Sequence, residues 1–310
     1  MPSLKAIRTR ITSVKNTRKI TRAMKLVSTA KLRRAQDALI AARPYTQAIS
    51  EVVSELAAVA GTDAHKLFGR SDPGPLQRVA LVVMTSDRGQ AGAFNANVTK
   101  AVERYAANEL SGASEVSLRI IGRKGNQYFS RRRATITSFD AAPIGATALD
   151  VAREMSNRVI SDFLEGKVDR VFVVYNEFKN AASQTTRVKQ ILPVVPEPRA
   201  AAAQDGHGTQ DGHGTQDAHG TGDATDFIYE PDRQTLLDRL VPLYVQILLY
   251  RAALESITSF FASQMTAMEN ATKNAGDMIS SLTLQYNRAR QASITKELSE
   301  IVGGAEALKG

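Results

Sequence analysis

The sequence has no cysteine and no tryptophan, and only 6% of its 310 residues are aromatic. Without cysteine it can form no disulfide, no thiolate metal site and no thiol switch, which fits a reducing compartment. It has four histidines, which leave little capacity for general acid–base catalysis. No apolar run approaches the roughly 20 residues that a membrane span needs, so we expect no direct membrane span.

Helix breakers are missing from both ends of the chain. Glycine and proline are absent between Pro2 and Pro44, and Gly276 is the only such residue from Pro242 until close to the C-terminus. Both ends are therefore predicted to be long helices. Ser3 is the expected N-cap of the first. We expect Pro44 to bend or interrupt the first helix, and Pro242 to kink the second.

The second long helix has a strict four-then-three spacing, which is a 3.5-residue repeat. Its fifteen seam positions are Leu240, Tyr244, Ile247, Arg251, Leu254, Thr258, Phe261, Met265, Met268, Thr272, Ala275, Ile279, Leu282, Tyr286 and Ala289. Such a repeat requires a partner helix, and the first helix opens with similar spacing. The two ends are therefore predicted to form a long antiparallel coiled coil, with the last turns of the longer helix projecting beyond the pair.

Between the two helices the hydrophobic period changes. Short β-branched runs alternate with amphipathic helices, which predicts an inserted α/β domain with a mostly parallel, doubly wound sheet. The expected strands are 79–85, 117–122, 134–139, 171–175 and 185–192, and the expected helices are 95–108, 125–131 and 149–165. The predicted segments are a helix over 1–60, an α/β domain over 76–196, an insertion over 199–226 and a second helix over 227–310.

The predicted insertion, residues 199–226, is a low-complexity segment built on repeats of GHGTQD. His207, His213 and His219 are six residues apart, so metal binding is conceivable. A glycine-rich polar repeat is more typical of a flexible tether, and that interpretation is favoured.

Positive charge is concentrated at the N-terminus. The net charge is +9, and eleven Lys and Arg residues precede Asp37, the first acidic residue. The N-terminal segment is therefore expected to bind an acidic partner. A basic coiled-coil nucleic-acid binder is the alternative, but no aromatic residue precedes Tyr45 to stack on bases. An Arg-rich, acid-poor start is also typical of a transit peptide, although here the pattern continues directly into the long helix.

An enzymatic function would rest on the glycine-bearing turn 86–95 after the first strand, because such turns cradle phosphate in α/β folds. The turn has neither of the two common glycine-rich phosphate-binding motifs, and no ordered nucleophile, base and orienting group is found elsewhere. The sequence therefore predicts no catalytic residue, no cofactor and no resident metal, and the enzyme hypothesis is the weakest of the three.

Three blocks of the sequence resemble the gamma subunit of F-type ATP synthase. They are ITSVKNTRKITRAMKLVSTAKL at 11–32, SDRG and GAFN within 86–95, and AMENATKNA with LTLQYNRARQASITKELSEIVGGA in the second long helix. The resemblance implies a non-catalytic central-stalk rotor. In this family the coiled coil turns inside a hexamer of alpha and beta subunits, and ion flow through a membrane ring drives the rotation.

The resemblance also implies partners for particular residues. Two short sets would contact the catalytic subunits and form a polar catch: Met24 and Lys25 in the first helix, and Arg290, Gln291, Thr295 and Glu300 in the second. A third set, Phe227, Tyr229 and Glu230, would contact the epsilon subunit and the proteolipid c-ring. The implied location is the cytoplasmic face of a bacterial cell membrane, reached through the complex.

One departure from the family pattern affects the seam. Gln264 stands where many members have an arginine, so the polar contact made there by those members is not carried over to this chain.

Overall fold

The computed structural model describes residues 3–61, 64–69, 77–195 and 232–307. Its chain contacts define two compact units. One unit contains residues 1–33, 90–92 and 261–310, and the other contains 34–89 and 93–260. We call them the coiled-coil unit and the α/β unit and describe each by itself. The four-segment division expected from the sequence stays a prediction.

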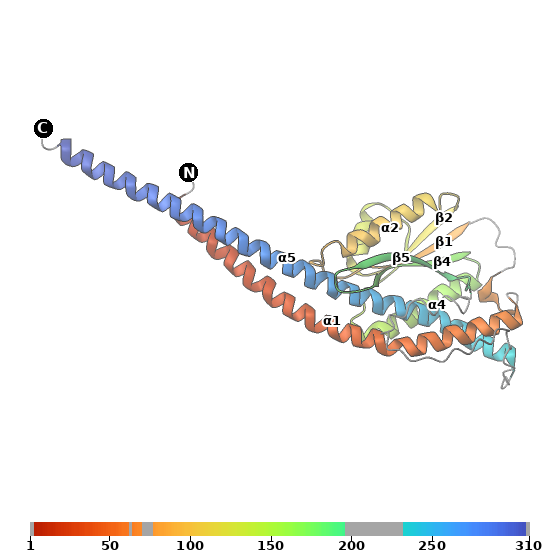
Figure 1. Ribbon diagram of the computed structural model, residues 1–310. Helices are drawn as coiled ribbons and strands as arrows, with labels where there is room; N and C mark the ends of the chain where they lie inside the picture. The colour runs from red at the N-terminus through yellow and green to blue at the C-terminus, as the bar shows by residue number, and fades with distance from the viewer. Residues whose placement is uncertain (1–2, 62–63, 70–76, 196–231, 308–310) are drawn as a thin grey trace, which may run out of the picture. The chain divides into compact units, whose positions relative to one another are not determined.

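Both ends of the chain are long helices, as predicted. Helix α1 spans Leu4–Ala60 and α5 spans Arg233–Ala307 (Figure 1). Ser3 caps α1, because its hydroxyl accepts a hydrogen bond from the Ala6 amide at 3.3 Å.

Helix α1 continues through Pro44, so the interruption expected as one of two outcomes is wrong, and the bend stays a prediction. A proline inside a helix leaves carbonyls of the preceding turn without their usual donors. The Thr46 hydroxyl donates to the nearby Arg43 carbonyl at 2.8 Å. Beyond the proline, Ile49, Val53 and Leu56 are buried, so packing supports the helix on that side. Helix α5 is likewise continuous through Pro242, and the kink expected there stays a prediction.

The 3.5-residue repeat of α5 is confirmed by burial. Each of the fifteen predicted seam positions is buried or half-buried, including the small side chains of Thr272 and Ala275. Beyond Leu282 exposure dominates, and only the predicted seam and Ser293 remain half-buried as far as residue 304. From residue 266 on, where exposed positions alternate with buried ones, the heptad pattern therefore identified the face of α5 that packs.

The α/β unit contains a five-stranded sheet. The strands are β1 (Arg78–Met84), β2 (Glu115–Ile121), β3 (Ile136–Asp140), β4 (Arg170–Phe178) and β5 (Gln184–Leu192). Their order is β3-β2-β1-β4-β5, with β1 to β4 parallel and β5 antiparallel to β4. The mostly parallel, doubly wound sheet predicted from the alternating pattern is confirmed.

Helices cover both faces of this sheet. The helices are α2 (Phe94–Asn108), α3 (Arg123–Arg131) and α4 (Ala148–Leu164), with 3-10 turns η2 (Lys66–Phe68) and η3 (Gly145–Thr147). One face packs on α2 and α3 through aliphatic and aromatic side chains. The strand residues of this cluster are Val79, Leu81, Val83, Leu118, Ile120, Phe172 and Val174, and the helix residues are Val98, Val102 and Phe129. Strand β1 is buried on both faces, which explains its unbroken apolar sequence.

Part of α5 is long and apolar enough to cross a membrane by length and composition alone. More than half of that stretch is buried within the protein. Residues 252–259 are buried at every position, so they are core residues of the α/β unit. Length and composition are weak grounds for a membrane span, because a core helix meets the same criteria.

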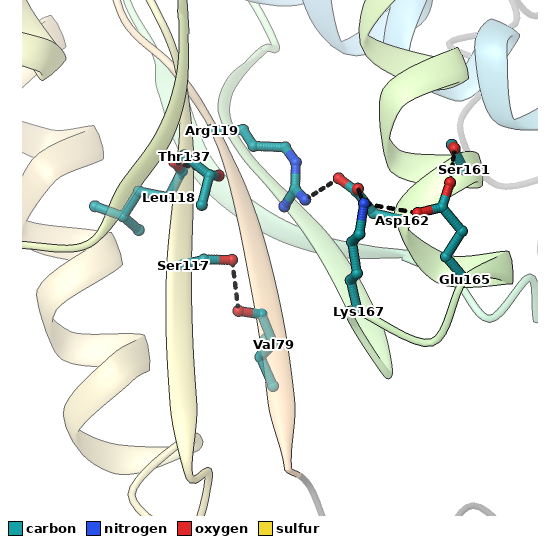
Figure 2. Close-up of polar contacts among 9 residues, drawn as sticks. All are labelled: Val79, Ser117, Leu118, Arg119, Thr137, Ser161, Asp162, Glu165 and Lys167. Atoms are coloured by element: carbon teal, nitrogen blue, oxygen red, sulfur yellow. Dashed lines mark hydrogen bonds and ion pairs between the residues drawn. The ribbon is translucent and has the colours of Figure 1, made fainter.

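A buried ion pair holds α4 to the second face of the sheet (Figure 2). Arg119 of β2 is 4% exposed and donates to Asp162 of α4. Lys167 lies 3.7 Å from Asp162 and 2.6 Å from Glu165, so two cations and two carboxylates balance here. Arg119 Nη1 is buried without a hydrogen-bond partner, which makes the guanidinium dependent on Asp162.

We expect Asp162→Ala to lower the free energy of unfolding by about 3 kcal/mol, because it leaves a buried guanidinium uncompensated. Urea denaturation of the purified chain measures this change. The control is Lys167→Ala, whose exposed side chain should contribute at most about 1 kcal/mol. Equal, small effects of the two substitutions would contradict the assignment.

Candidate partner-contacting surface

The position where a doubly wound sheet would bind a nucleotide is filled by the protein itself. The strand order places the topological switch point between β1 and β4, and ligands bind outside the carboxyl ends of such strands. There the Asn176 side chain donates to the Phe94 carbonyl at 3.1 Å, and the Asn176 carbonyl accepts from Ser259 at 2.9 Å. Phe260 stacks edge-on against Phe94 at 5.5 Å. Helix α5 therefore occupies this position.

The amides at the N-terminus of α3 are also bound internally. Asp87 accepts from the Arg123 amide, the Ser86 carbonyl accepts from the Lys124 amide at 3.0 Å, and the Thr85 hydroxyl accepts from the Gly125 amide at 2.9 Å. Gly122 is required here, because a Cβ at that residue would lie 2.3 Å from the Thr85 carbonyl oxygen. Residues 85–87, at the start of the glycine-bearing turn, are therefore bonded to the first turn of α3.

The coiled-coil unit pairs α1 and α5 through polar contacts as well as apolar ones. The Thr272 hydroxyl lies 2.8 Å from that of Thr21, and Ser28 lies 2.9 Å from the Gln264 side-chain oxygen within the seam. Gln264, at the position where the family pattern is broken, therefore has a buried partner on the opposite helix. These cross-helix contacts confirm the antiparallel pairing.

The pairing leaves the end of α5 without α1 opposite it. The two contacting pairs have residue numbers that sum to 293 (21 + 272) and 292 (28 + 264). By the same sum Leu4, the first residue of α1, lies opposite residue 289 or so. The helix continues to Ala307, which is about 27 Å of unpaired helix at 1.5 Å per residue (Figure 1). The predicted projection of α5 is confirmed.

The two predicted contact residues of α1 are not fully exposed to solvent. Met24 and Lys25 are half-buried, and the Lys25 ammonium lies 2.6 Å from Glu269 of α5. The other ten early cations are exposed. Among the described residues, Lys25 is the only one of the eleven for which the structure gives an ion pair. Most of the positive charge of α1 is therefore free to face a partner.

The four predicted contact residues of α5 are all exposed and follow residue 289. Glu300 lies 3.5 Å from Lys296, and the Thr295 carbonyl accepts from Ser299 at 2.9 Å. Arg290 and Gln291 come first in this unpaired part of the helix. The structure brings these four residues onto one projecting helix, and their contacts with other subunits stay a prediction.

The sequence interpretation missed an exposed apolar stripe on the same helix end. Ile294, Leu298 and Ile301 are 44%, 58% and 67% exposed and recur at helical spacing, with Val302 beside them. The i, i+4, i+7 spacing was the available signal, but the same spacing is typical of a buried seam. A contiguous apolar stripe in water marks a contact surface.

Other predicted residues lie outside the described residues. They are Phe227, Tyr229 and Glu230, and the three histidines of the repetitive insertion, His207, His213 and His219. Over the described parts of the chain, no group of three or more metal-ligating side chains occurs.

These features define a class: a chain whose two terminal helices pair as a long shaft, with an α/β domain whose ligand position is filled by its own helix. Residues 3–308 match the family model described as ATP synthase, and the chain is 46% identical to the ATP synthase gamma chain of Anaeromyxobacter sp. (strain Fw109-5), over 312 residues and all of both chains. The chain belongs to the ATP synthase gamma-chain family. It is a non-catalytic central-stalk subunit of that membrane-associated complex.

Further comparisons agree. The chain is 44% identical to the gamma chain of Sorangium cellulosum (strain So ce56) over 333 residues, covering 100% of both. It is similar to a chain of the Tetrahymena thermophila mitochondrial ATP synthase central stalk and c-ring, with a TM-score of 0.58 and 26% identity over 81% of this chain and 99% of that one. A Euglena gracilis mitochondrial ATP synthase chain shares the fold, with a TM-score of 0.65 and 19% identity over 98% and 94%. No support emerges for the nucleic-acid-binding alternative.

We expect the purified chain to show no saturable heat of binding with Mg-ATP in isothermal titration calorimetry. The physical reason is that the switch point holds Ser259 and Phe260, and the α3 amides already have acceptors. Stoichiometric binding with a micromolar Kd would contradict the filled-site interpretation.

Proposed function

We propose that this chain is the rotary shaft that couples ion flow through a membrane ring to ATP synthesis in a catalytic hexamer. The observation that supports this most directly is the pairing of two unlike helices, which gives the shaft a different surface in every direction. A ring of otherwise identical sites around such a shaft meets a different face at each site. The interaction energy then differs between sites, and each site's conformation is biased in turn as the shaft rotates.

The partners in this proposal are the alpha and beta subunits of the hexamer, the epsilon subunit and the proteolipid c-ring. Part of the support is the similarity to a Tetrahymena chain whose structure is described as central stalk and c-ring. The basic surface of α1 suits acidic loops of the catalytic subunits. Exposed ion pairs contribute only about 0–1 kcal/mol each, so such contacts can be broken on every turn.

Particular residues have roles in the proposal. Met24 and Lys25 contact the catalytic subunits from the first helix, while Arg290, Gln291, Thr295 and Glu300 form a polar catch near the end of the second. Phe227, Tyr229 and Glu230 contact the epsilon subunit and the ring.

The proposed location is the cytoplasmic face of a bacterial cell membrane, held there through the complex. The support for it is the 44–46% identity to the Sorangium and Anaeromyxobacter gamma chains.

Affinity purification tests the proposal. A tagged copy of the chain, extracted from its own membranes in mild detergent, should copurify with the hexamer, the epsilon subunit and the c-ring, and the complex should pump ions when supplied with ATP. Isolation of the tagged chain without these subunits would overturn the shaft proposal. Strong, steeply salt-dependent retention on DNA would favour the nucleic-acid alternative instead.

The exposed stripe of α5 gives a second prediction. Replacing Ile294, Leu298 and Ile301 together by serine should leave the Tm of the isolated chain nearly unchanged, because these side chains are exposed. The same variant should bind the isolated hexamer at least about tenfold more weakly, since roughly 0.8 kcal/mol is lost per CH₂ no longer buried.

Surface plasmon resonance with immobilised hexamer measures this affinity. A control variant with Thr283, Leu284 and Arg288 replaced by serine alters the exposed side of α5 where α1 still lies opposite. Unchanged affinity of the stripe variant, or an equal loss in the control, would show that the stripe is not a contact surface.

A further inference from the structure

The short turn η2, which lies in the sequence between α1 and β1, is docked on the rest of the α/β unit. Two of its side chains are buried, with Leu67 1% and Phe68 6% exposed. The Leu67 carbonyl accepts a hydrogen bond from the Val194 amide at 2.7 Å, just beyond the end of β5. Residues 64–69 and 194 and the first turns of α5 all belong to the α/β unit, so these contacts lie within one compact unit.

His65 caps this turn with its imidazole ring. Its backbone is extended, as is typical of an N-cap, and its Nδ1 accepts a hydrogen bond from the Leu67 amide at 3.1 Å. Ser, Thr, Asp and Asn usually supply such an acceptor. An imidazole nitrogen accepts only while it has no proton, so the cap exists only when the ring is neutral and its proton is on Nε2.

A carboxylate of α5 faces the other ring nitrogen. Asp238 Oδ1 lies 3.6 Å from His65 Nε2, which is too long for a strong hydrogen bond but close enough for an ion pair with a charged ring. The Gln234 side-chain amide donates to Asp238 at 3.0 Å and to the Ala64 carbonyl at 3.2 Å. These two bonds hold the carboxylate beside the turn.

The surroundings of His65 favour the neutral ring. Burial lowers the pKa of His65, Asp238 opposes this effect, and the positive charge of Lys66 adds to it. In the part of the chain that the structure describes, these are the charged groups that act on the ring. Helix α4 also packs on the turn and adds no charge to this set. The capping form is therefore the one present at neutral pH.

We propose that His65 is a two-position switch: the neutral ring caps η2 at the Leu67 amide, and the protonated ring loses that bond and pairs with Asp238 of α5. The inference goes beyond the proposed shaft function and does not depend on it.

The sign of the pH dependence follows from the direction of the shift. The pKa of His65 in the folded chain is below the ordinary value of about 6.5. The cap therefore contributes its full stability above about pH 6.5 and loses it as the pH falls through the lower, folded-state pKa.

NMR spectroscopy of the full-length ¹⁵N-labelled chain between pH 7.5 and 5 tests the proposal. At pH 7.5 the ¹⁵N shifts of His65 should show the tautomer with its proton on Nε2. As the ring gains its second proton, the hydrogen-exchange protection factor of the Leu67 amide should fall about fivefold, the usual effect of losing an N-cap. The opposite tautomer, or unchanged protection after protonation, would overturn the proposal.

The matched control is His65→Asn, because an asparagine oxygen can cap the turn and does not titrate. Protection of the Leu67 amide in this variant should be independent of pH, and a wild-type pH dependence would contradict the role of the ring. The amide of Val82, a buried residue of β1, serves as a reference within the same chain. Its protection should stay constant, since a parallel loss would mean that the whole unit opens and the effect is not local.

Asp238→Asn tests the second position of the switch. Without the carboxylate the charged ring has lost its partner, so the titration midpoint of His65 should move to lower pH. An unchanged or higher midpoint would show that the protonated ring does not pair with Asp238. All three measurements use the isolated full-length chain, so they can fail without affecting the shaft proposal, which is tested in the complex.

Discussion

The pairing of the first helix with the last is the interaction on which the rest of this structure depends. Neither helix could remain as long in water by propensity alone, since most helix stability in proteins comes from packing. The seam supplies that packing with small and polar side chains. Thr21 meets Thr272 and Ser28 meets Gln264, so the backbones can approach without large interlocking residues. A seam of this kind fixes the register of the helices through hydrogen bonds, whose geometry tolerates little displacement.

The α/β unit has a doubly wound sheet, but the position where such sheets bind ligands is occupied by its own helix. In a doubly wound sheet the carboxyl edge at the switch point is open to ligands. Here Ser259 and Phe260 of α5 lie at that edge, and residues 252–259 are buried at every position. The same fold that elsewhere positions a nucleotide therefore holds a helix. Function in this chain lies in its surfaces, which fits membership of a family of central-stalk subunits.

Much of the fold was predictable because its signals are local and periodic. The 3.5-residue repeat identified the seam of α5, and the alternation of β-branched runs with helices identified five strands to within a few residues. The interruption expected at Pro44 failed because local propensity does not include packing. Proline removes the hydrogen bond to the Ile40 carbonyl, but the residues buried beyond it support the helix.

The surroundings of the predicted partner-contacting residues were harder to predict from the sequence. Lys25 was expected to face a partner, and its pairing with Glu269, 244 positions along the chain, depends on how two distant helices align. The stripe formed by Ile294, Leu298 and Ile301 has the spacing of a buried face. Its exposure follows from the antiparallel register, which places Leu4 at the start of α1 opposite residue 289 or so.

The sequence by itself determined that both ends are long helices, which face of the second one packs, the succession of strands and helices in the inserted domain and the absence of thiol chemistry. These are set by residue type and spacing along the chain. The tertiary structure alone decided that the nucleotide position is filled by α5 and that Lys25 pairs with Glu269. Each depends on distances between residues far apart in the sequence, and the periodicity of the sequence does not determine those distances.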